Sequence, residues 1–159
     1  MACRSSPVSR AGGLRLPERL RDRIVAEARA AHPHEACGVL IGERDDASGV
    51  TRVDEALAAE NVSEGDRRRR FLIAPEVLLP AQREALAAGR EIVGYYHSQP
   101  ESRPVPSAAD RAAAWPEVSY LIVGVGGGEI GELRCWRLDP VAGTFVEERL
   151  AIDEPRARS

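Results

Sequence analysis

The chain has 159 residues, a formal net charge of −3 and a pI of about 5.7, with 43% hydrophobic and 30% charged residues. This is the length of one domain and the composition of an ordinary folded protein. The charge leaves no basic field for nucleic acid, and no apolar run could cross a bilayer. All 22 basic residues are Arg, which excludes a lysine nucleophile. The three scattered cysteines fit a reducing compartment, so we expect a cytoplasmic protein without nucleic-acid or membrane partners.

Apolar periodicity and turn residues predict a mixed α/β (α+β) fold, with one central sheet flanked by helices. We expect, in chain order, a helix from Leu16 to Ala31, strands over 35–42 and 50–59, a helix from Pro75 to Gly89, a strand over 91–97, a helix from Ser107 to before Pro116, and strands over 119–125, 131–138 and 144–152. Residues 1–14 and 152–159 are expected to be flexible tails around one domain at 15–151.

The stretch GYYHSQPESRPVPSAAD at 94–110 places three potential metal ligands at a strand end and a helix start. Side chains two positions apart on a strand share a face, so His97 and Gln99 should point the same way. Asp110, in the first turn of the following helix, can be directed back at them, which leaves a fourth position for water. In the competing interpretation, Ser107 and Asp110 only cap the helix and His97 is a hydrogen-bonded structural residue.

These residues, taken with an upstream glutamate, resemble the signature of the JAMM (MPN+) zinc metallopeptidases. The signature is a glutamate followed downstream by His-x-His-Pro, six residues, Ser, two residues and Asp. The corresponding residues here are Glu35, His97-Ser98-Gln99-Pro100, Ser107 and Asp110. The flanking segments HPHEACGVLIG, RFLIAPE and AAAWPEVSYLIVGV are also similar to the family, and the likeness extends from about residue 14 to residue 150.

The resemblance implies a cytidine-deaminase-like fold and hydrolysis of an amide bond with one Zn²⁺ per chain. His97 and Asp110, with Gln99, would hold the zinc, which activates a water. Glu35 would take up the proton and pass it to the leaving amine, and Ser107 would donate a hydrogen bond to the oxyanion.

By the same resemblance, the substrate would be a ubiquitin-like sulfur-carrier protein, cut after its C-terminal Gly-Gly. Its extended tail would lie beside the strand that carries His97. The resemblance and the exposed strand edges also favour a homodimer.

Gln99 is the one departure from the signature, which has a second His at this position. An amide oxygen is a weaker and harder donor to zinc than imidazole, so we expect lower affinity or a preference for another divalent ion. The alternative function is a metal-deficient binding or scaffold module. A third interpretation is an engineered or sequencing change from His in an otherwise standard enzyme.

Other conspicuous residues are assigned structural roles. Cys37, Trp115 and Trp136 are expected to pack, and Gly126–Gly128 to form a hairpin turn. Arg67–Arg70 predicts a solvated loop, or a surface that docks an acidic protein.

Overall fold

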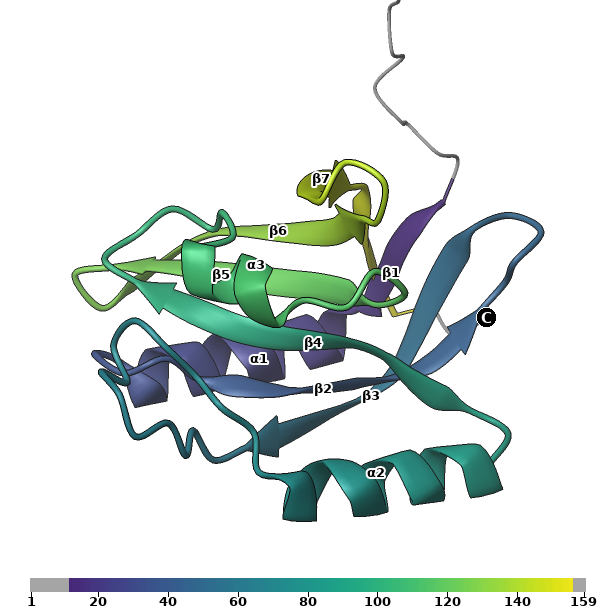
Figure 1. Ribbon diagram of the computed structural model, residues 1–159, viewed down its shortest axis with the longest axis horizontal. Coiled ribbons are helices and arrows are strands. Elements are labelled where there is room, and N and C mark those ends of the chain that lie inside the picture. The colour runs from purple at the N-terminus through teal and green to yellow at the C-terminus, as the bar shows by residue number, and fades with distance from the viewer. Residues whose placement is uncertain (1–11, 156–159) are drawn as a thin grey trace, which may run out of the picture.

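A computed structural model describes residues 12–155, which form one eight-stranded mixed sheet with helices on both faces (Figure 1). The elements are β1 (Gly13–Pro17), α1 (Glu18–Ala31), β2 (Cys37–Arg44), β3 (Val50–Ala59), α2 (Pro75–Ala87), β4 (Glu91–Pro100), α3 (Ala108–Ala113), β5 (Ser119–Gly126), β6 (Glu129–Asp139), β7 (Thr144–Glu148) and β8 (Leu150–Asp153). The expected mixed fold is confirmed. Within the described residues, no helix is both long and apolar enough to span a membrane.

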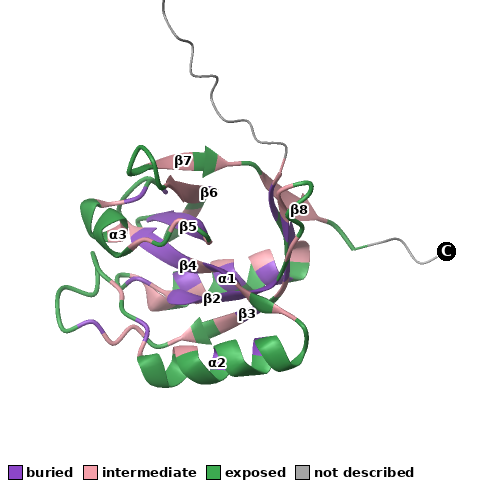
Figure 2. Ribbon diagram, turned by 45° about the vertical axis from the view of Figure 1, so that its right-hand side comes forward, coloured by how far each residue is buried: buried purple, intermediate pink, exposed green. Residues whose placement is uncertain are grey.

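The strand order is β7-β6-β5-β4-β2-β3-β1-β8, which places β4 near the middle of the sheet. Strands β2, β4 and β5 carry long runs of buried residues, as Figure 2 shows. The edge strands β7 and β8 are separated in sequence only by Arg149, whose carbonyl accepts a hydrogen bond from Leu14 N at 2.8 Å. The sheet must therefore curve, because a single residue connects its two ends.

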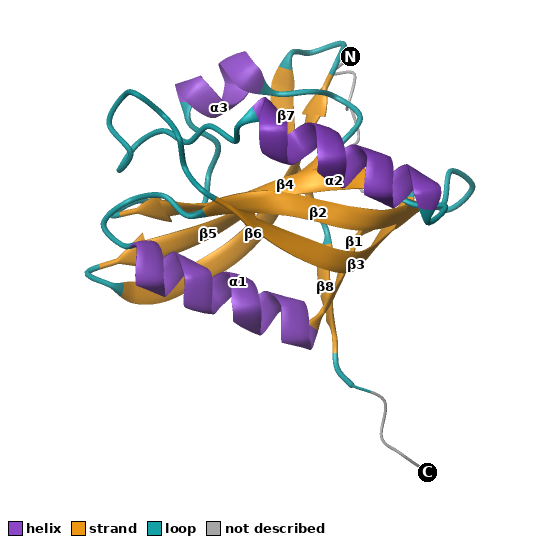
Figure 3. Ribbon diagram, turned by 90° about the horizontal axis from the view of Figure 1, so that it is seen from below, coloured by secondary structure: helices purple, strands orange, loops and turns teal. Residues whose placement is uncertain are grey.

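The two faces of the sheet carry separate apolar clusters, with α1 on one side and α2 and α3 on the other (Figure 3). On the α1 side, Leu20, Ile24 and Ala28 are buried, as their spacing predicts. Tyr96 extends from β4 to the same side, where its hydroxyl donates to Glu27 of α1. On the other side, Cys37, Val39 and Ile41 of β2 pack with Ile73 and Ala85.

The helix predicted from Leu16 begins only at Glu18, because the preceding residues form β1. Leu14 and Leu16 are buried and alternate with exposed Arg15, and the strand pairs in parallel with both β3 and β8. Leu16 fits two patterns, since it lies two residues after Leu14 and four before Leu20. The strand period prevails at this position because two neighbouring strands satisfy its backbone groups.

The single strand expected over 144–152 is two strands, which pair with opposite edges of the sheet. The continuation into β8 also gives Asp153 a place in the sheet, although it falls within the expected flexible tail. The same is true of Gly13 and Leu14 at the other end. The remainder of the two expected tails, 1–11 and 156–159, lies outside the described residues.

Strand β4 continues beyond the expected end at residue 97 and includes Gln99 and Pro100. It is paired on both sides, with β2 as far as Cys37↔His97 and with β5 as far as Pro100↔Val125. Ser98 also exchanges hydrogen bonds with the backbone of Ala36. Among the described residues, β2 and β5 therefore occupy both sides of β4 at His97, so a substrate tail could not pair with the backbone of β4 at this residue.

Candidate metal centre

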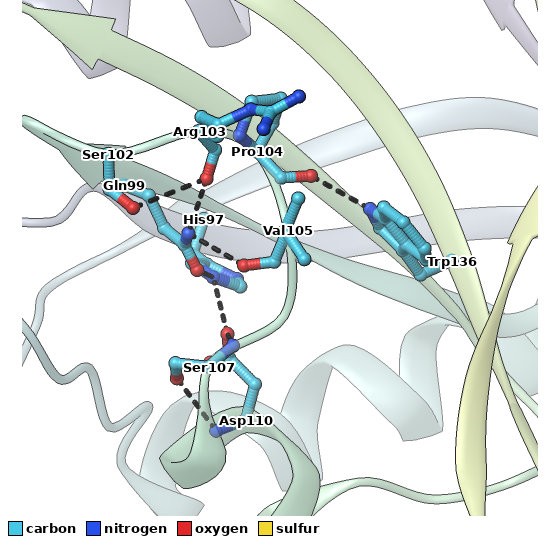
Figure 4. Close-up of polar contacts among 9 residues, drawn as sticks. All are labelled: His97, Gln99, Ser102, Arg103, Pro104, Val105, Ser107, Asp110 and Trp136. Atoms are coloured by element: carbon cyan, nitrogen blue, oxygen red, sulfur yellow. Dashed lines mark hydrogen bonds and ion pairs between the residues drawn. The ribbon is translucent and has the colours of Figure 1, made fainter.

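Three polar side chains from β4 and α3 face one another at the end of the sheet (Figure 4). His97 and Gln99 lie on the same face of β4, as expected, and His97 Nε2 is 3.4 Å from Gln99 Oε1. Asp110 approaches from α3, and its Oδ2 is also 3.4 Å from His97 Nε2. The structure therefore brings together all three residues that the sequence singles out as metal ligands.

The position of Asp110 is fixed by a reciprocal capping box at the start of α3. Ser107 Oγ accepts a hydrogen bond from Asp110 N at 3.1 Å, and Asp110 Oδ2 accepts one from Ser107 N at 2.7 Å. The capping box is thus confirmed, whereas an exclusively structural role for these residues is not tested by it. The cap directs the carboxylate of Asp110 at His97, because Oδ2 makes both contacts.

His97 is 1% exposed, and the ring of Phe71 stacks on it with centroids 4.6 Å apart. Burial alone would lower the pKa of His97. The hydrogen bond to Asp110 and the charges of Asp110 and Glu35 outweigh burial, so the pKa is raised. Burial likewise opposes ionisation of Asp110, but the contacts with His97 and Ser107 hold its pKa below the ordinary value. The contact with Asp110 thus favours protonation of the imidazole more than burial alone would allow.

Glu35 lies just before β2 and is only 5% exposed. Its backbone is held by the loop after β3, since its N–H donates to Arg67 O at 2.7 Å and its carbonyl accepts from Asn61 Nδ2 at 3.3 Å. Burial raises the pKa of its carboxyl to about 7, a rise that Asp110 reinforces and His97 opposes. Its Oε2 is buried without a hydrogen-bond partner among the described residues. Such an acid can take up and release a proton near neutral pH.

The spacing of the cluster fits a small divalent cation. A separation of 3.4 Å is long for a hydrogen bond. It is close to the edge of a tetrahedron of ligands about 2.1 Å from a central ion, which is also about 3.4 Å. Among residues 12–155, no group of three or more His, Cys, Asp or Glu side chains could hold a metal ion. The cluster supplies two such residues, and an amide is the third.

Several contacts of the site were not anticipated from the sequence. Phe71 stacks on His97, and Asn61 donates a hydrogen bond to the backbone of Glu35. Of these two residues, only Phe71 lies in a segment that resembles the family, the flank RFLIAPE. The Arg67–Arg70 run is exposed as expected, and the carbonyl oxygen of Arg67 accepts the hydrogen bond from Glu35 N. Cys37 is buried, which raises the pKa of its thiol to about 12, so it packs as expected and is no nucleophile at neutral pH.

Comparison with known proteins gives consistent matches over most of the chain. Residues 17–139 match the family described as prokaryotic homologs of the JAB domain. Desampylase of Haloferax volcanii is 40% identical over 107 residues, which are 64% of this chain and 73% of that protein. CysO-cysteine peptidase of Mycobacterium tuberculosis is 30% identical over 136 residues, 85% of this chain and 88% of that protein. The solution structure of protein DSY2949 from Desulfitobacterium hafniense superposes with a TM-score of 0.76 at 26% identity, covering 89% of this chain and 94% of that one.

Proposed function

Since this chain belongs to the JAB (JAMM/MPN) family, we propose that it is a zinc-dependent peptidase that acts on the C-terminal end of a ubiquitin-like protein. The convergence of His97, Gln99 and Asp110, together with the buried carboxyl group of Glu35 that is coupled by charge to His97 and Asp110, carries the proposal. The relatives named desampylase and CysO-cysteine peptidase support a substrate in which an amide bond joins a small protein to another group. We infer that cleavage follows a C-terminal Gly-Gly of a sulfur-carrier protein, as the resemblance implies.

His97 Nε2, Asp110 Oδ2 and Gln99 Oε1 would hold the metal. When bound, zinc lowers the pKa of water to near neutrality and polarises a carbonyl group. The imidazole must be neutral to act as a ligand, and the raised pKa of His97 therefore makes metal uptake compete with protonation.

Glu35 would move the proton. A carboxyl group with a pKa of about 7 is ionised in part of the population at neutral pH, so it can accept a proton from the attacking water. The same group, once protonated, can give that proton to the leaving amine. Its low exposure supports this role, because bulk water then has little access to the proton being carried.

Ser107 would stabilise charge on the substrate. Its Oγ accepts the hydrogen bond from Asp110 N, which leaves the hydroxyl proton free to donate. A donor placed at the start of α3 can act on the oxygen of the scissile carbonyl as negative charge develops there. Both edges of β4 are occupied, so the substrate tail would enter over the face formed by α3 and the 60–74 loop.

The second candidate function is a binding module that no longer holds metal. The contact between His97 and Gln99 favours it, since imidazole and amide can satisfy each other without an ion. In this case the domain would still recognise a carrier protein, but it would not hydrolyse it.

Metal content and cleavage together separate the two functions. The native protein, purified without chelator, should contain about one zinc per chain and should remove an extension placed after the Gly-Gly of a ubiquitin-like protein, measured by mass spectrometry. The Glu35→Gln variant should keep the metal and lose cleavage. If only the Gln99→His variant binds metal and cleaves, this chain is a binding module. If neither binds a divalent ion, the proposed metal centre is wrong.

A further inference from the structure

The amide of Gln99 is held at its nitrogen by two backbone carbonyls (Figure 4). Nε2 donates to Arg103 O and to Val105 O, each at 2.8 Å. These two contacts, here called the carbonyl clamp, use both protons of the amide nitrogen. A reversed amide would place its oxygen against two carbonyl oxygens, so the clamp dictates which end faces His97. That end is Oε1, the only atom of the amide that can bind a cation.

The segment that provides the clamp is itself fixed from two sides. Trp136 of β6 donates from its indole Nε1 to Pro104 O at 2.9 Å, between the two clamp residues. On the neighbouring strand β5, Gly124 is the register partner of Gln99. A Cβ at Gly124 would lie only 3.0 Å from Pro104 Cδ, so the segment packs closely on the glycine backbone. The position of the clamp therefore depends on the sheet as well as on the loop.

We propose that Trp136 and the carbonyl clamp are positioning elements that orient Gln99 as an oxygen donor to the bound metal. The inference rests on the proposed metal centre and goes beyond it, since it assigns a role to groups that touch neither metal nor substrate. A free glutamine side chain can present either its oxygen or its nitrogen, and it loses rotamer freedom on binding an ion. The clamp fixes both the orientation of the amide and the rotamer of the side chain before an ion binds, so neither costs free energy on binding. Partners of this kind around a metal typically change affinity by about 10 to 100-fold.

A purely structural role makes a different prediction. If Gln99 is only a cross-link between β4 and the 101–107 loop, loosening the clamp would lower the stability of the fold and leave the affinity for metal unchanged. If the clamp positions a ligand, the affinity must fall, and the spectrum of bound Co²⁺ must change with the donor geometry.

The test is a zinc titration of the full chain, stripped of metal, against a chromophoric chelator of known affinity. The Trp136→Phe variant keeps an aromatic ring and removes the donor to Pro104, and its Kd for zinc should rise about tenfold or more. The Trp115→Phe variant is the matched control, because Trp115, contrary to the expectation that it packs, is 68% exposed, and the indole that donates to Pro104 O is that of Trp136. Its Kd should stay within about twofold of the native value, as should its Co²⁺ spectrum.

A second variant tests the clamp without relying on Trp136. Gln99→Glu preserves size and adds a negative charge, which by charge alone should strengthen the binding of a cation. The clamp predicts the opposite, because one carboxylate oxygen would face the Arg103 and Val105 carbonyls without a proton to donate. Zinc binding should therefore be no tighter than in the native chain.

The inference is overturned if Trp136→Phe binds zinc as tightly as the native chain, or if Gln99→Glu binds it more tightly than the native chain. In either case the proposed function stands, since the native chain still holds metal. If the native chain binds no divalent ion while Gln99→His does, the proposed function and the inference both fail.

Discussion

Replacing Glu35 by Gln in the metal-free protein should remove a pH dependence that this carboxyl group imposes on stability. The pKa of Glu35 is about 7 in the folded chain, against an ordinary value of 4.5. Between these values the folded state holds a proton that the unfolded state has lost, so unfolding releases a proton and stability falls as pH rises. The loss is complete above about pH 7. Below about pH 4.5 both states are protonated and the effect vanishes.

The size of the effect follows from the separation of the two pKa values. At about 1.4 kcal/mol for each tenfold change in proton affinity, the shift corresponds to about 3 kcal/mol of unfolding free energy. The Gln variant has no proton to lose. Its stability relative to the native chain should therefore rise by about 3 kcal/mol between pH 4.5 and pH 8. Urea unfolding at a series of pH values, with EDTA present throughout, measures this difference directly.

The control is Glu64→Gln, a substitution of the same chemistry at an exposed position in the 60–74 loop. The raised pKa of His97 also makes stability fall with rising pH. Because the charge of Glu35 contributes to that rise, the difference between native and Glu35→Gln includes a smaller change at His97, which acts in the same direction. If the native and Glu35→Gln curves run parallel from pH 4.5 to pH 8, the carboxyl group is not desolvated in the folded chain. Its assignment as the proton carrier would then lose its physical basis.

Three further outcomes follow from the same contacts. Ser107→Ala should lose about 1 kcal/mol of stability with the helix cap and slow cleavage by about 10² to 10³-fold, whereas Ser107→Thr should keep the cap, as thermal unfolding and turnover assays would report. Saturating zinc at about 100 times its Kd should raise the unfolding free energy of the native chain by about 2.7 kcal/mol, and EDTA should reverse the gain; no shift on addition of zinc would argue against the site. Leu16→Ala should cost about 2 to 5 kcal/mol in urea unfolding, because Leu16 is fully buried in β1, and a cost below 1 kcal/mol would contradict its place in the sheet.

The parts of the fold predicted correctly from the sequence are those set by local pattern. His97 and Gln99 share one face of β4 because side chains alternate along a strand. The spacing of Ser107 and Asp110 predicts the capping box that the structure contains. The start of the first helix was misplaced because Leu16 satisfies the strand and helix periods equally well. Only pairing with β3 and β8, which are distant in sequence, decides between them.

The division of the expected strand over 144–152 into β7 and β8 at Arg149 is not predictable from the sequence for a related reason. Residues 144–152 read TFVEERLAI and contain no Gly, Pro, Asn or Asp, so no turn residue marks the point where the chain leaves one edge of the sheet for the other. That point is set by the curvature of the whole sheet. The contact of Trp136 with Pro104 is equally invisible in the sequence, since an indole that packs in a strand and one that also donates a hydrogen bond have the same local pattern.

Position 99 illustrates why a motif read by residue type alone can undervalue a site. Compared as isolated donors, amide oxygen binds zinc more weakly than imidazole, and the substitution suggests a lost metal. The clamp alters the comparison because the orientation of Gln99 is settled in the folded chain by two hydrogen bonds that do not involve the ion. The oxygen of the amide is then directed at His97 before any ion binds. This fixed orientation offsets part of the weaker affinity of an amide oxygen for zinc. On this argument, whether a Gln in place of the second His abolishes metal binding depends on its nitrogen: a Gln with an unpaired Nε2 should lose the ion, and one held as Gln99 is held should retain it.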